Sequence, residues 1–473
     1  MTTRFFACYW LIFNLLAGVS SLVFHAATAA EEPPPNLGTR RAGDDWPTFL
    51  GPTGDGKSPE KGVLIPWPKQ GPKIVWSRKL GTSYGGPTVC RGRLFQFDRF
   101  GDQARLYCVH AETGSPLWKY EYPTAYEDHY GYNNGPRCSP LVDGNRVYAL
   151  GAEGMLACVR ADSGQEVWKL DTAKQFGVVQ NFFGVGSNPV IEGDLLLVMV
   201  GGSPRDAAGA QPRPLDRVEG DGSGIVAFDK FTGQVKYKIT DELASYAPLK
   251  LATIGGRRWC FAFCRGGLVG FEPATGKVDF QYPWRAAILE SVNASGPVVV
   301  ANRVLISETY GPGSSLLEVS PSSHKVIWKD TERTRAKALQ THWNTPIYHD
   351  GFVFGCSGRH TENADLRCLD WKTGKVLWKE PGTTRVQLTY VDGHFLSLGE
   401  YGELKLIRAR GDKFDLVAEA VIKEAVPAPV VSNEAERPLL KYPCWAAPVI
   451  SHGLLYARGA DRLVCLELIP DKN

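Results

Sequence analysis

Short alternating apolar stretches recur along the chain, each bounded by glycine, proline or an Asp-Gly pair. The stretch Leu-Tyr-Cys-Val at 106–109 runs into Ala-Glu-Thr-Gly-Ser at 111–115 and then into Pro-Leu-Trp-Lys at 116–119. Gly114 can adopt the positive φ that a tight turn requires. The pattern predicts two antiparallel strands joined at Gly114, with Trp118 on the second strand.

This phrase of a turn glycine followed four residues later by an aromatic residue returns along the chain. The aromatic residues are Trp118, Trp168, Tyr237, Phe280, Trp328 and Trp378, and His324 replaces the glycine before Trp328. Their spacings are 50, 69, 43, 48 and 50 residues. A strand-rich period of about 40–50 residues is typical of propeller blades. We expect each aromatic residue, together with Trp76, to dock its blade on the neighbouring one rather than to bind a cofactor.

A second phrase opens each unit, in which proline precedes a short apolar stretch and a glycine, as in Ser139-Pro-Leu-Val-Asp-Gly144. Together the two phrases describe four-stranded antiparallel blades. The expected blades span 85–122, 133–171, 184–241, 245–284, 290–330, 342–380, 386–423 and 442–469. The last lacks an outer strand, which residues 72–77 can supply, closing the ring. We therefore predict an all-β, eight-bladed propeller closed by its N-terminal strand. Seven blades remain an alternative because the unit at 386–423 has no tryptophan.

The N-terminal residues predict a targeting segment, and the overall charge argues against nucleic acid as a partner. A basic start at Arg4, an apolar stretch from Phe5 to Phe24 and the small residues Ala27-Thr28-Ala29 predict a signal peptide over 1–30, with an uncleaved anchor as the alternative. Residues 31–45 are rich in proline and charge and predict a linker, so that 46–473 form one domain. The net charge of +3, without long runs of like charge, gives no case for nucleic acid. We expect an exported monomer of the periplasm or cell envelope.

The cysteines predict core packing rather than disulfides or metal sites. Four of them occupy one repeat position just before the turn, namely Cys108, Cys158, Cys368 and Cys465. The other units place Ala227, Gly270 and Glu318 there, so the position mostly takes a small residue. A bridge between Cys356 and Cys368 stays open. No Cys-x-x-Cys pair is present, and no metal site is expected.

The repeat phrases resemble those of the quinoprotein, or PQQ-like, β-propellers. The resemblance is carried by Leu-Val-Gly-Phe-Glu-Pro-Ala-Thr-Gly-Lys-Val at 268–278 and Leu-Arg-Cys-Leu-Asp-Trp-Lys-Thr-Gly-Lys-Val-Leu-Trp at 366–378, and it covers about 46–469. It implies the fold and leaves two functions, because the repeat residues are structural. One branch contains PQQ-dependent alcohol and aldose sugar dehydrogenases, and the other contains non-catalytic propellers such as BamB, an outer-membrane assembly lipoprotein.

An enzyme of the first branch needs an aromatic residue to stack on the quinone, an arginine for its carboxylates, a Ca²⁺ site and an Asp base. The chain lacks the adjacent cysteines of the alcohol dehydrogenases and a haem-type Cys-x-x-Cys-His. The segments that lead into the first strands of the blades should converge at the propeller axis. They supply the candidate cofactor-binding residues Arg137, Asn133, Asn293, Trp343, Asn344 and Trp445. The alternative is that these residues bond between blades and fill the channel mouth.

We therefore predict a non-catalytic binding or scaffold propeller of the cell envelope that engages a protein or small ligand through one face, without a cofactor. The alternative is a PQQ- and calcium-dependent oxidoreductase with a divergent site. A further hypothesis is a carbohydrate- or peptide-binding propeller that uses the insertion at 201–224. Convergence of a carboxylate, an amide and an arginine on one pocket would favour the enzyme.

Overall fold

The protein is described from a computed structural model, which describes residues 1–2, 32–179, 182–204, 218–289, 291–331, 336–423 and 438–471. Two compact units are separable, Met1–Glu32 and Pro33–Asn473. The predicted signal peptide and most of the insertion at 201–224 lie outside the described residues. No helix among the described residues is long and apolar enough to cross a membrane.

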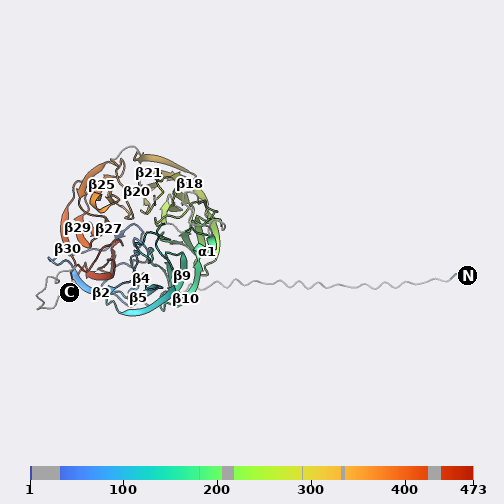
Figure 1. The fold of residues 1–473 in the computed structure, drawn as a ribbon, viewed down its shortest axis with the longest axis horizontal. Coiled ribbons are helices and arrows are strands. Elements are labelled where there is room, and N and C mark those ends of the chain that lie inside the picture. The colour runs from blue at the N-terminus through green and yellow to red at the C-terminus, as the bar shows by residue number, and fades with distance from the viewer. Residues whose placement is uncertain are drawn as a thin grey trace. The chain divides into compact units, whose positions relative to one another are not determined.

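The described residues from 33 onwards form a ring of eight sheets, each built on four antiparallel strands; six of the sheets use only consecutive strands, from the axis outwards (Figure 1). Blades 1 to 4 contain β3 (Thr88–Cys90), β4 (Arg93–Phe100), β5 (Gln103–His110) and β6 (Pro116–Pro123); β7 (Leu141–Asp143), β8 (Arg146–Leu150), β9 (Met155–Arg160) and β10 (Glu166–Asp171); β11 (Val190–Glu192), β12 (Leu195–Met199), β13 (Ile225–Asp229) and β14 (Val235–Ile239); β15 (Lys250–Ile254), β16 (Arg257–Phe263), β17 (Gly267–Phe271) and β18 (Val278–Pro283).

Blades 5 to 8 complete the ring and include the unit without a tryptophan. Their strands are β19 (Val298–Val300), β20 (Arg303–Glu308), β21 (Gly313–Ser320) and β22 (Ser323–Lys329); β23 (Ile347–His349), β24 (Phe352–Ser357), β25 (Asp365–Asp370) and β26 (Val376–Pro381); β27 (Val386–Val391), β28 (His394–Gly399), β29 (Glu403–Arg408) and β30 (Leu416–Val421); β31 (Val449–Ser451), β32 (Leu454–Arg458), β33 (Arg462–Glu467) and β2 (Lys73–Lys79). The prediction of eight blades is confirmed. Helical structure among the described residues is confined to α1 (Thr172–Phe176) and η2 (Thr361–Asn363).

The ring closes between the two ends of the domain. Strand β2 pairs antiparallel with β33, so that Trp76 lies opposite Cys465. In Figure 1 the blue β2 lies in the same part of the ring as the red C-terminal strands. The eighth blade therefore takes its outer strand from the N-terminal side of the chain, as predicted, and β33 has no free edge.

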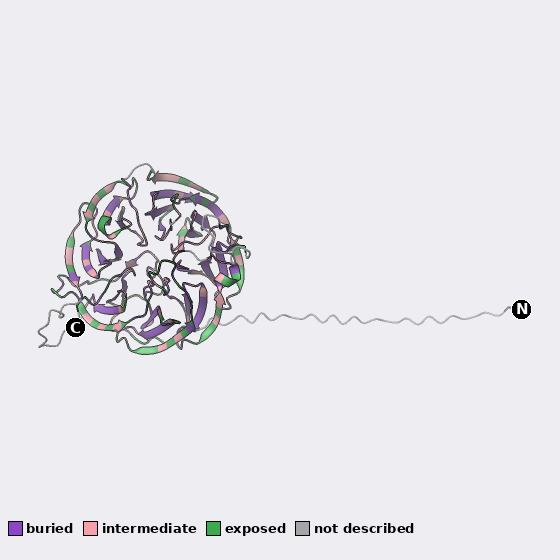
Figure 2. Ribbon diagram, viewed as in Figure 1, coloured by how far each residue is buried: buried purple, intermediate pink, exposed green. Residues whose placement is uncertain are grey.

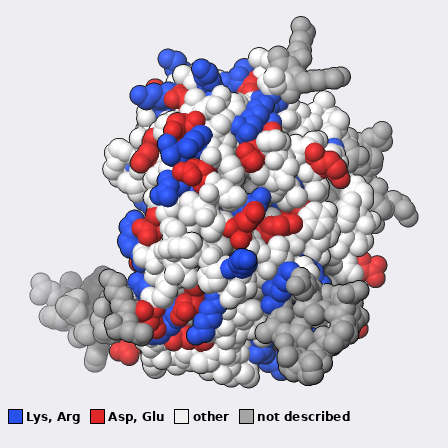
Figure 3. All heavy atoms as spheres, turned by 90° about the vertical axis from the view of Figure 1, so that its left-hand side faces the viewer, with Lys and Arg blue, Asp and Glu red and all other residues white. Residues whose placement is uncertain are grey.

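Burial follows the position of each strand in its blade. The central strands are buried almost throughout, whereas the outer strands alternate, as the exposed and intermediate residues of β2 show (Figure 2). On the side of the ring that Figure 3 presents, basic and acidic residues are interspersed. This side therefore offers no extended surface of one charge.

The repeated aromatic residues lie on the outer strands and pack against the next blade. Trp118 of blade 1 donates its Nε1–H to the carbonyl of Ala161 in blade 2 at 3.0 Å. Its ring covers Gly164, where an added Cβ would lie 2.4 Å from Cε3. Equivalent bonds join Trp76 to Ala111, Trp168 to Lys230, Trp328 to Trp371, Trp378 to Arg410 and the Tyr237 hydroxyl to Pro273. Phe280 has no donor and packs on His324, with ring centroids 5.0 Å apart.

The register explains the small residues that precede the turns. Cys108, Cys158, Cys368 and Cys465 lie directly opposite Trp118, Trp168, Trp378 and Trp76. A small residue leaves room for the indole, and all four cysteines are fully buried. The ten cysteines among the described residues are all free, including Cys356 and Cys368. In blade 5, Leu316 faces Trp328, so the assignment of Glu318 to this position was wrong by two residues.

Residues 46–58 form a feature that the repeat did not predict. Strand β1 (Lys57–Ser58) adds a fifth, parallel strand to the inner edge of blade 7. The same segment bonds to blade 1 through Trp46 and Val89 and to blade 4 through Lys250, whose Nζ donates to the carbonyls of Thr53 and Gly54. It therefore crosses the axis of the ring and is called the floor segment below.

The chain before the floor segment lies against blades 8 and 1. The backbone of Leu37 donates to the carbonyl of Arg91 at 3.1 Å, and Arg40 forms an ion pair with Glu467. The buried carboxylate of Glu60 accepts hydrogen bonds from the backbone of Asp44, His452 and Gly453. These bonds tie both sides of the floor segment to the eighth blade.

Candidate functional site

The segments that precede the inner strands meet at the axis and surround a cavity of about 420 Å³. This axial cavity is lined by aromatic and basic residues, with a few small ones between them. Its lining comprises Phe49, Tyr84, Tyr132, Arg137, Phe183, Gly186, Asn188, Tyr246, Pro248, Val292, Ala294, Tyr310, His342, Trp343, Arg359, His360, Arg385, Gln387, Tyr442, Trp445 and Ala446. No aspartate or glutamate belongs to this lining.

The axial cavity is closed at one end by the floor segment. Phe49 belongs both to the floor segment and to the cavity lining. On either side of Phe49, the carbonyl of Pro47 accepts a bond from Val142 in blade 2, and Gly54 is held by Lys250 in blade 4. The axial cavity is therefore blocked at one end by the floor segment and is not an open pore; it is called the cup below.

Arg137 reaches the cavity from the segment before β7. Its guanidinium forms an ion pair with Asp128 at 2.5 Å and donates to the carbonyl of Gly135. The side chain of Asp128 is fully buried. The guanidinium also lies 5.5 Å from the ring centroids of Tyr84 and Tyr126. The charge of Arg137 is therefore balanced, and its remaining surface faces aromatic rings.

Arg385 immediately precedes β27 and forms the second ion pair at the cavity. Its Nη2 and Nε lie 2.6 and 3.0 Å from Glu400 Oε2. Its guanidinium lies 4.6 and 5.2 Å from the ring centroids of Trp343 and Trp445. Burial alone would raise the pKa of Glu400, but hydrogen bonds from Arg385 and Thr361 lower it below its ordinary value. Glu400 is therefore an ionised partner of Arg385, and it also accepts the indole N–H of Trp445 at 3.2 Å.

Arg359 is the third arginine at the cavity, and it differs from the other two. Its guanidinium lies 4.5 Å from the ring centroid of Tyr310. Its carbonyl accepts a bond from Arg385 at 3.2 Å, which fixes the backbone. Among the described residues no carboxylate lies within ion-pair distance of Arg359. It is therefore a cation at the cavity that forms no ion pair with a described carboxylate, although its charge acts on the buried Glu308 nearby.

Two titratable groups lie beside Arg359. Burial, together with the charges of Arg385, Arg359 and His360, lowers the pKa of His342 to about 3, so its imidazole is neutral. Its Nε2 lies 3.1 Å from the Tyr310 hydroxyl. Burial raises the pKa of Glu308, which is only 1% exposed, to about 7. Backbone bonds from Tyr310 and Gly311 and the charges of Lys337 and Arg359 oppose this rise.

The six candidate residues fall into two groups. Arg137, Trp343 and Trp445 line the axial cavity, and the two indoles have ring centroids 4.5 Å apart. The three asparagines do not line it and instead hold loops. Asn133 accepts from Gly135, Asn344 bonds to His342 and Cys356, and the fully buried Asn293 donates to Cys264 and Trp284. Cofactor binding by any of the six stays a prediction.

Sequence reasoning missed Arg385, Arg359 and Phe49. Arg385 directly precedes an inner strand, much as Arg137 does, so the same rule applied to the seventh unit would have found it. Arg359 lies in the connection between β24 and η2, and Phe49 lies in the floor segment, where no repeat phrase marks them. The segments that lead into the inner strands of blades 3 and 5 also contain Asn181 and Glu290, which lie outside the described residues.

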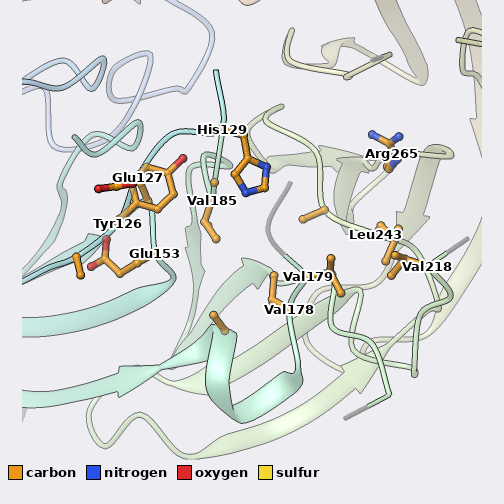
Figure 4. A pocket seen from close by; sticks show the side chains of 16 residues that line it. Tyr126, Glu127, His129, Glu153, Val178, Val179, Val185, Val218, Leu243 and Arg265 are labelled. Atoms are coloured by element: carbon orange, nitrogen blue, oxygen red, sulfur yellow. The ribbon is translucent and has the colours of Figure 1, made fainter. Parts of the chain in front are cut away.

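A second cavity of about 500 Å³ lies away from the axis (Figure 4). Figure 4 shows Val178, Val179 and Val185 on its wall, with Glu153 and Tyr126 on one side. Burial raises the pKa of Glu153, whose carboxylate accepts a bond from Tyr122 at 2.7 Å. This cavity is mostly apolar, so the gathering of cations and aromatic rings belongs to the axial cavity.

The axial cavity fits one half of the cofactor that the dehydrogenase branch requires. Arginines and indoles suit a flat anion. Calcium and a general base would need free carboxylates, yet none lines the cavity, and Asp128 and Glu400 behind it are each bound to an arginine. The described residues contain no group of three or more His, Cys, Asp or Glu side chains placed to hold a metal. The residues present therefore do not fit PQQ with calcium.

Comparison with known proteins gives both a family and a fold. The family model described as outer membrane protein assembly factor BamB matches residues 68–213 and 133–380. The crystal structure of BamB from Moraxella catarrhalis is similar, with a TM-score of 0.54 at 13% identity over 85% of this chain and 99% of that chain. Quinohemoprotein alcohol dehydrogenase from Comamonas testosteroni gives 0.60 at 12% identity over 91% and 81%. No curated protein sequence matches. At these identities the two structures show the fold alone.

Proposed function

The chain belongs to the PQQ-like family of the outer membrane protein assembly factor BamB, and from this premise we propose that it is a non-catalytic binding propeller of the cell envelope. It engages a protein or a small ligand through the face onto which the axial cavity opens, and it acts as an exported monomer. Nucleic acid is not among the proposed partners, because the chain has a small net charge.

One observation carries the proposal. The axial cavity gathers three arginines and no carboxylate in its lining, and the two carboxylates behind it are already paired. Such a set can attract and orient an anionic group, but it offers no free carboxylate as a base or a calcium ligand. The balance of groups therefore suits recognition better than catalysis.

A second candidate is a quinoprotein oxidoreductase with a divergent site. The observation in its favour is that Arg385 lies against both Trp343 and Trp445, which is a surface on which a flat anionic quinone could stack. This candidate requires a calcium site and a base beyond the described lining. Calcium dependence therefore separates the two candidates.

The test is a calorimetric titration of the purified protein with PQQ, once in calcium and once in EDTA, followed by an absorbance scan of the washed protein and a dye-linked screen of alcohols and aldose sugars. We expect no calcium-dependent stoichiometric binding and no dye reduction. Calcium-dependent binding together with substrate-dependent dye reduction would overturn the proposal in favour of the oxidoreductase.

A second measurement locates the binding face in cells. A photo-crosslinking residue placed at Tyr442, which lines the axial cavity and is 45% exposed, should give defined adducts. The matched control is Val235 on the outer strand of blade 3, which is 39% exposed. Equal crosslinking from both positions would contradict binding through the axial face.

A further inference from the structure

The mouth of the axial cavity carries exposed tyrosines. Tyr132 and Tyr442 belong to the lining and are 66% and 45% exposed. Each of the two contacts a further tyrosine. The ring centroids of Tyr130 and Tyr132 are 6.1 Å apart, and Tyr401 stacks on Tyr442 with ring centroids 5.1 Å apart. Tyr130 and Tyr401 are themselves 50% and 46% exposed. We call these four residues the tyrosine rim.

The tyrosine rim extends the binding surface beyond the cavity. A small molecule held in 420 Å³ would not need aromatic side chains outside its pocket. Exposed aromatic residues grouped around a recess are typical of surfaces that bind polypeptides, where tyrosine, tryptophan and arginine provide most of the binding energy. The rim therefore favours a ligand that continues out of the cavity.

The cavity itself specifies a negative charge. Arg137 and Arg385 are neutralised by Asp128 and Glu400, whereas Arg359 forms no ion pair among the described residues. Its backbone is fixed by Arg385 and its guanidinium rests on Tyr310, so it is held in place rather than free to turn into solvent. A guanidinium with this support is suited to a carboxylate, which it can bind through two parallel hydrogen bonds.

The floor segment limits which part of a partner polypeptide can enter the axial cavity. Because the segment containing Phe49 crosses the axis, a chain cannot pass through the ring. A chain end can enter the cup, and a terminal carboxylate brings its charge there without further residues behind it. The aromatic lining, including Trp343 and Tyr246, then surrounds apolar or aromatic side chains next to that carboxylate.

We propose that the axial cavity binds the C-terminal carboxylate of a partner polypeptide whose last residues are aromatic or apolar, with Arg359 as its counter-ion and the tyrosine rim contacting the residues before it. This rests on the proposed function, because it names the ligand of the same face. It requires no chemical step, only capture of a chain end.

The test is a titration of the full-length protein with an acetylated peptide, Ala-Ala-Tyr-Phe with a free C-terminus, followed by calorimetry and by tryptophan fluorescence. The matched ligand is the same peptide as a C-terminal amide. We expect the amide to bind about 10- to 100-fold more weakly, which is the range for losing a hydrogen bond to a charged group. Arg359→Met should weaken the free-acid peptide by a similar factor.

The control variant is Arg78→Met. Arg78 is also a half-buried arginine over a tyrosine, with its guanidinium 5.4 Å from the Tyr107 ring centroid, but it does not line the cavity. The substitution Arg78→Met removes the same charge as Arg359→Met and should leave the affinity for the peptide unchanged. Thermal melting of both variants shows whether either has lost its fold, and Arg359→Lys, which keeps the charge, should retain part of the affinity.

Any one of the following results would overturn the inference: equal binding of acid and amide, no effect of Arg359→Met in a folded protein, or equally tight binding of 3-phenylpropionate alone. The last result would make the cavity a small-carboxylate site. Binding of an acidic oligosaccharide in preference to the peptide would likewise contradict it. In each case the calcium and crosslinking tests still judge the proposed function separately, so the two proposals can fail independently.

Discussion

Glutamine in place of Glu308 should remove a pH dependence from the stability of the propeller. Glu308 is 1% exposed, its Oε2 accepts the backbone N–H of Tyr310 at 2.7 Å, and its Oε1 has no hydrogen-bond partner among the described residues. Burial raises its pKa from 4.5 to about 7. Because the folded state holds this proton more tightly than the unfolded state, the contribution of Glu308 to stability is greatest below pH 4.5 and falls as the pH rises to 7.

The size of the effect follows from the shift in pKa. A rise from 4.5 to about 7 corresponds to about 3 kcal/mol between pH 4 and pH 8, at about 1.4 kcal/mol per unit. The amide of Glu308→Gln can keep the acceptor for Tyr310, but its NH₂ group occupies the place of the unpartnered Oε1. Burying this unsatisfied NH₂ group lowers the free energy of unfolding by the same amount at every pH. The expected signature is therefore the change with pH, in which the variant gains about 3 kcal/mol relative to the natural protein from pH 4 to pH 8.

The assay is urea unfolding at pH 4, 6 and 8 and constant ionic strength, followed by tryptophan fluorescence and by circular dichroism to check that the two transitions coincide. Glu362→Gln, which removes an exposed carboxylate in η2, is the control and should differ by less than about 0.5 kcal/mol throughout. A difference for Glu308→Gln that stays constant from pH 4 to pH 8 would show that Glu308 is not held protonated, and the reasoning would be wrong.

Three further predictions concern the ring and its ion pairs. Gly164→Ala should destabilise the fold by about 2–4 kcal/mol, because the new Cβ meets Trp118 at a φ of +73°, whereas Gly193→Ala at +58° with open space should cost about 1–2 kcal/mol in the same thermal melts. Arg385→Met should cost about 3–5 kcal/mol in urea unfolding by leaving Glu400 buried and unpaired, and adding Glu400→Gln should recover much of the loss. A chain that begins at residue 80 should form oligomers in size-exclusion chromatography, because β33 then has an unpaired edge, and a monomeric profile would contradict this role of β2.

The fold was predictable because each repeat phrase contains both a residue that forms a turn within its blade and a residue that packs on the next blade. The glycine sets the turn, and the aromatic residue four positions later covers the equivalent glycine of the next blade, as Trp118 covers Gly164. The interval between successive aromatic residues in the sequence therefore indicates where one blade ends and the next begins. The error at Glu318 arose because the hairpin of blade 5 is longer: Leu316 lies opposite Trp328, twelve positions away, whereas Cys108 lies opposite Trp118, ten positions away. The phrase is also degenerate there, because His324 replaces the glycine.

The site was predictable only in part, for a related reason. Arg137, Trp343 and Trp445 precede inner strands, and the repeat shows where those strands begin. Arg359 comes from a connection between two later strands of its blade, and its importance depends on its forming no ion pair with a described carboxylate, which spacing cannot show. Phe49 belongs to a segment whose strand has two residues and no periodicity, so its position at the axis depends on bonds to distant blades.

The floor segment also couples ligand binding to closure of the ring. Phe49 and Trp445 are far apart in the sequence but line the same cavity, and the strand β2 that follows the floor segment pairs with β33 of the eighth blade. A ligand in this cavity contacts segments from both sides of the closure. Its binding free energy therefore adds to the contacts between β2 and β33 that close the ring.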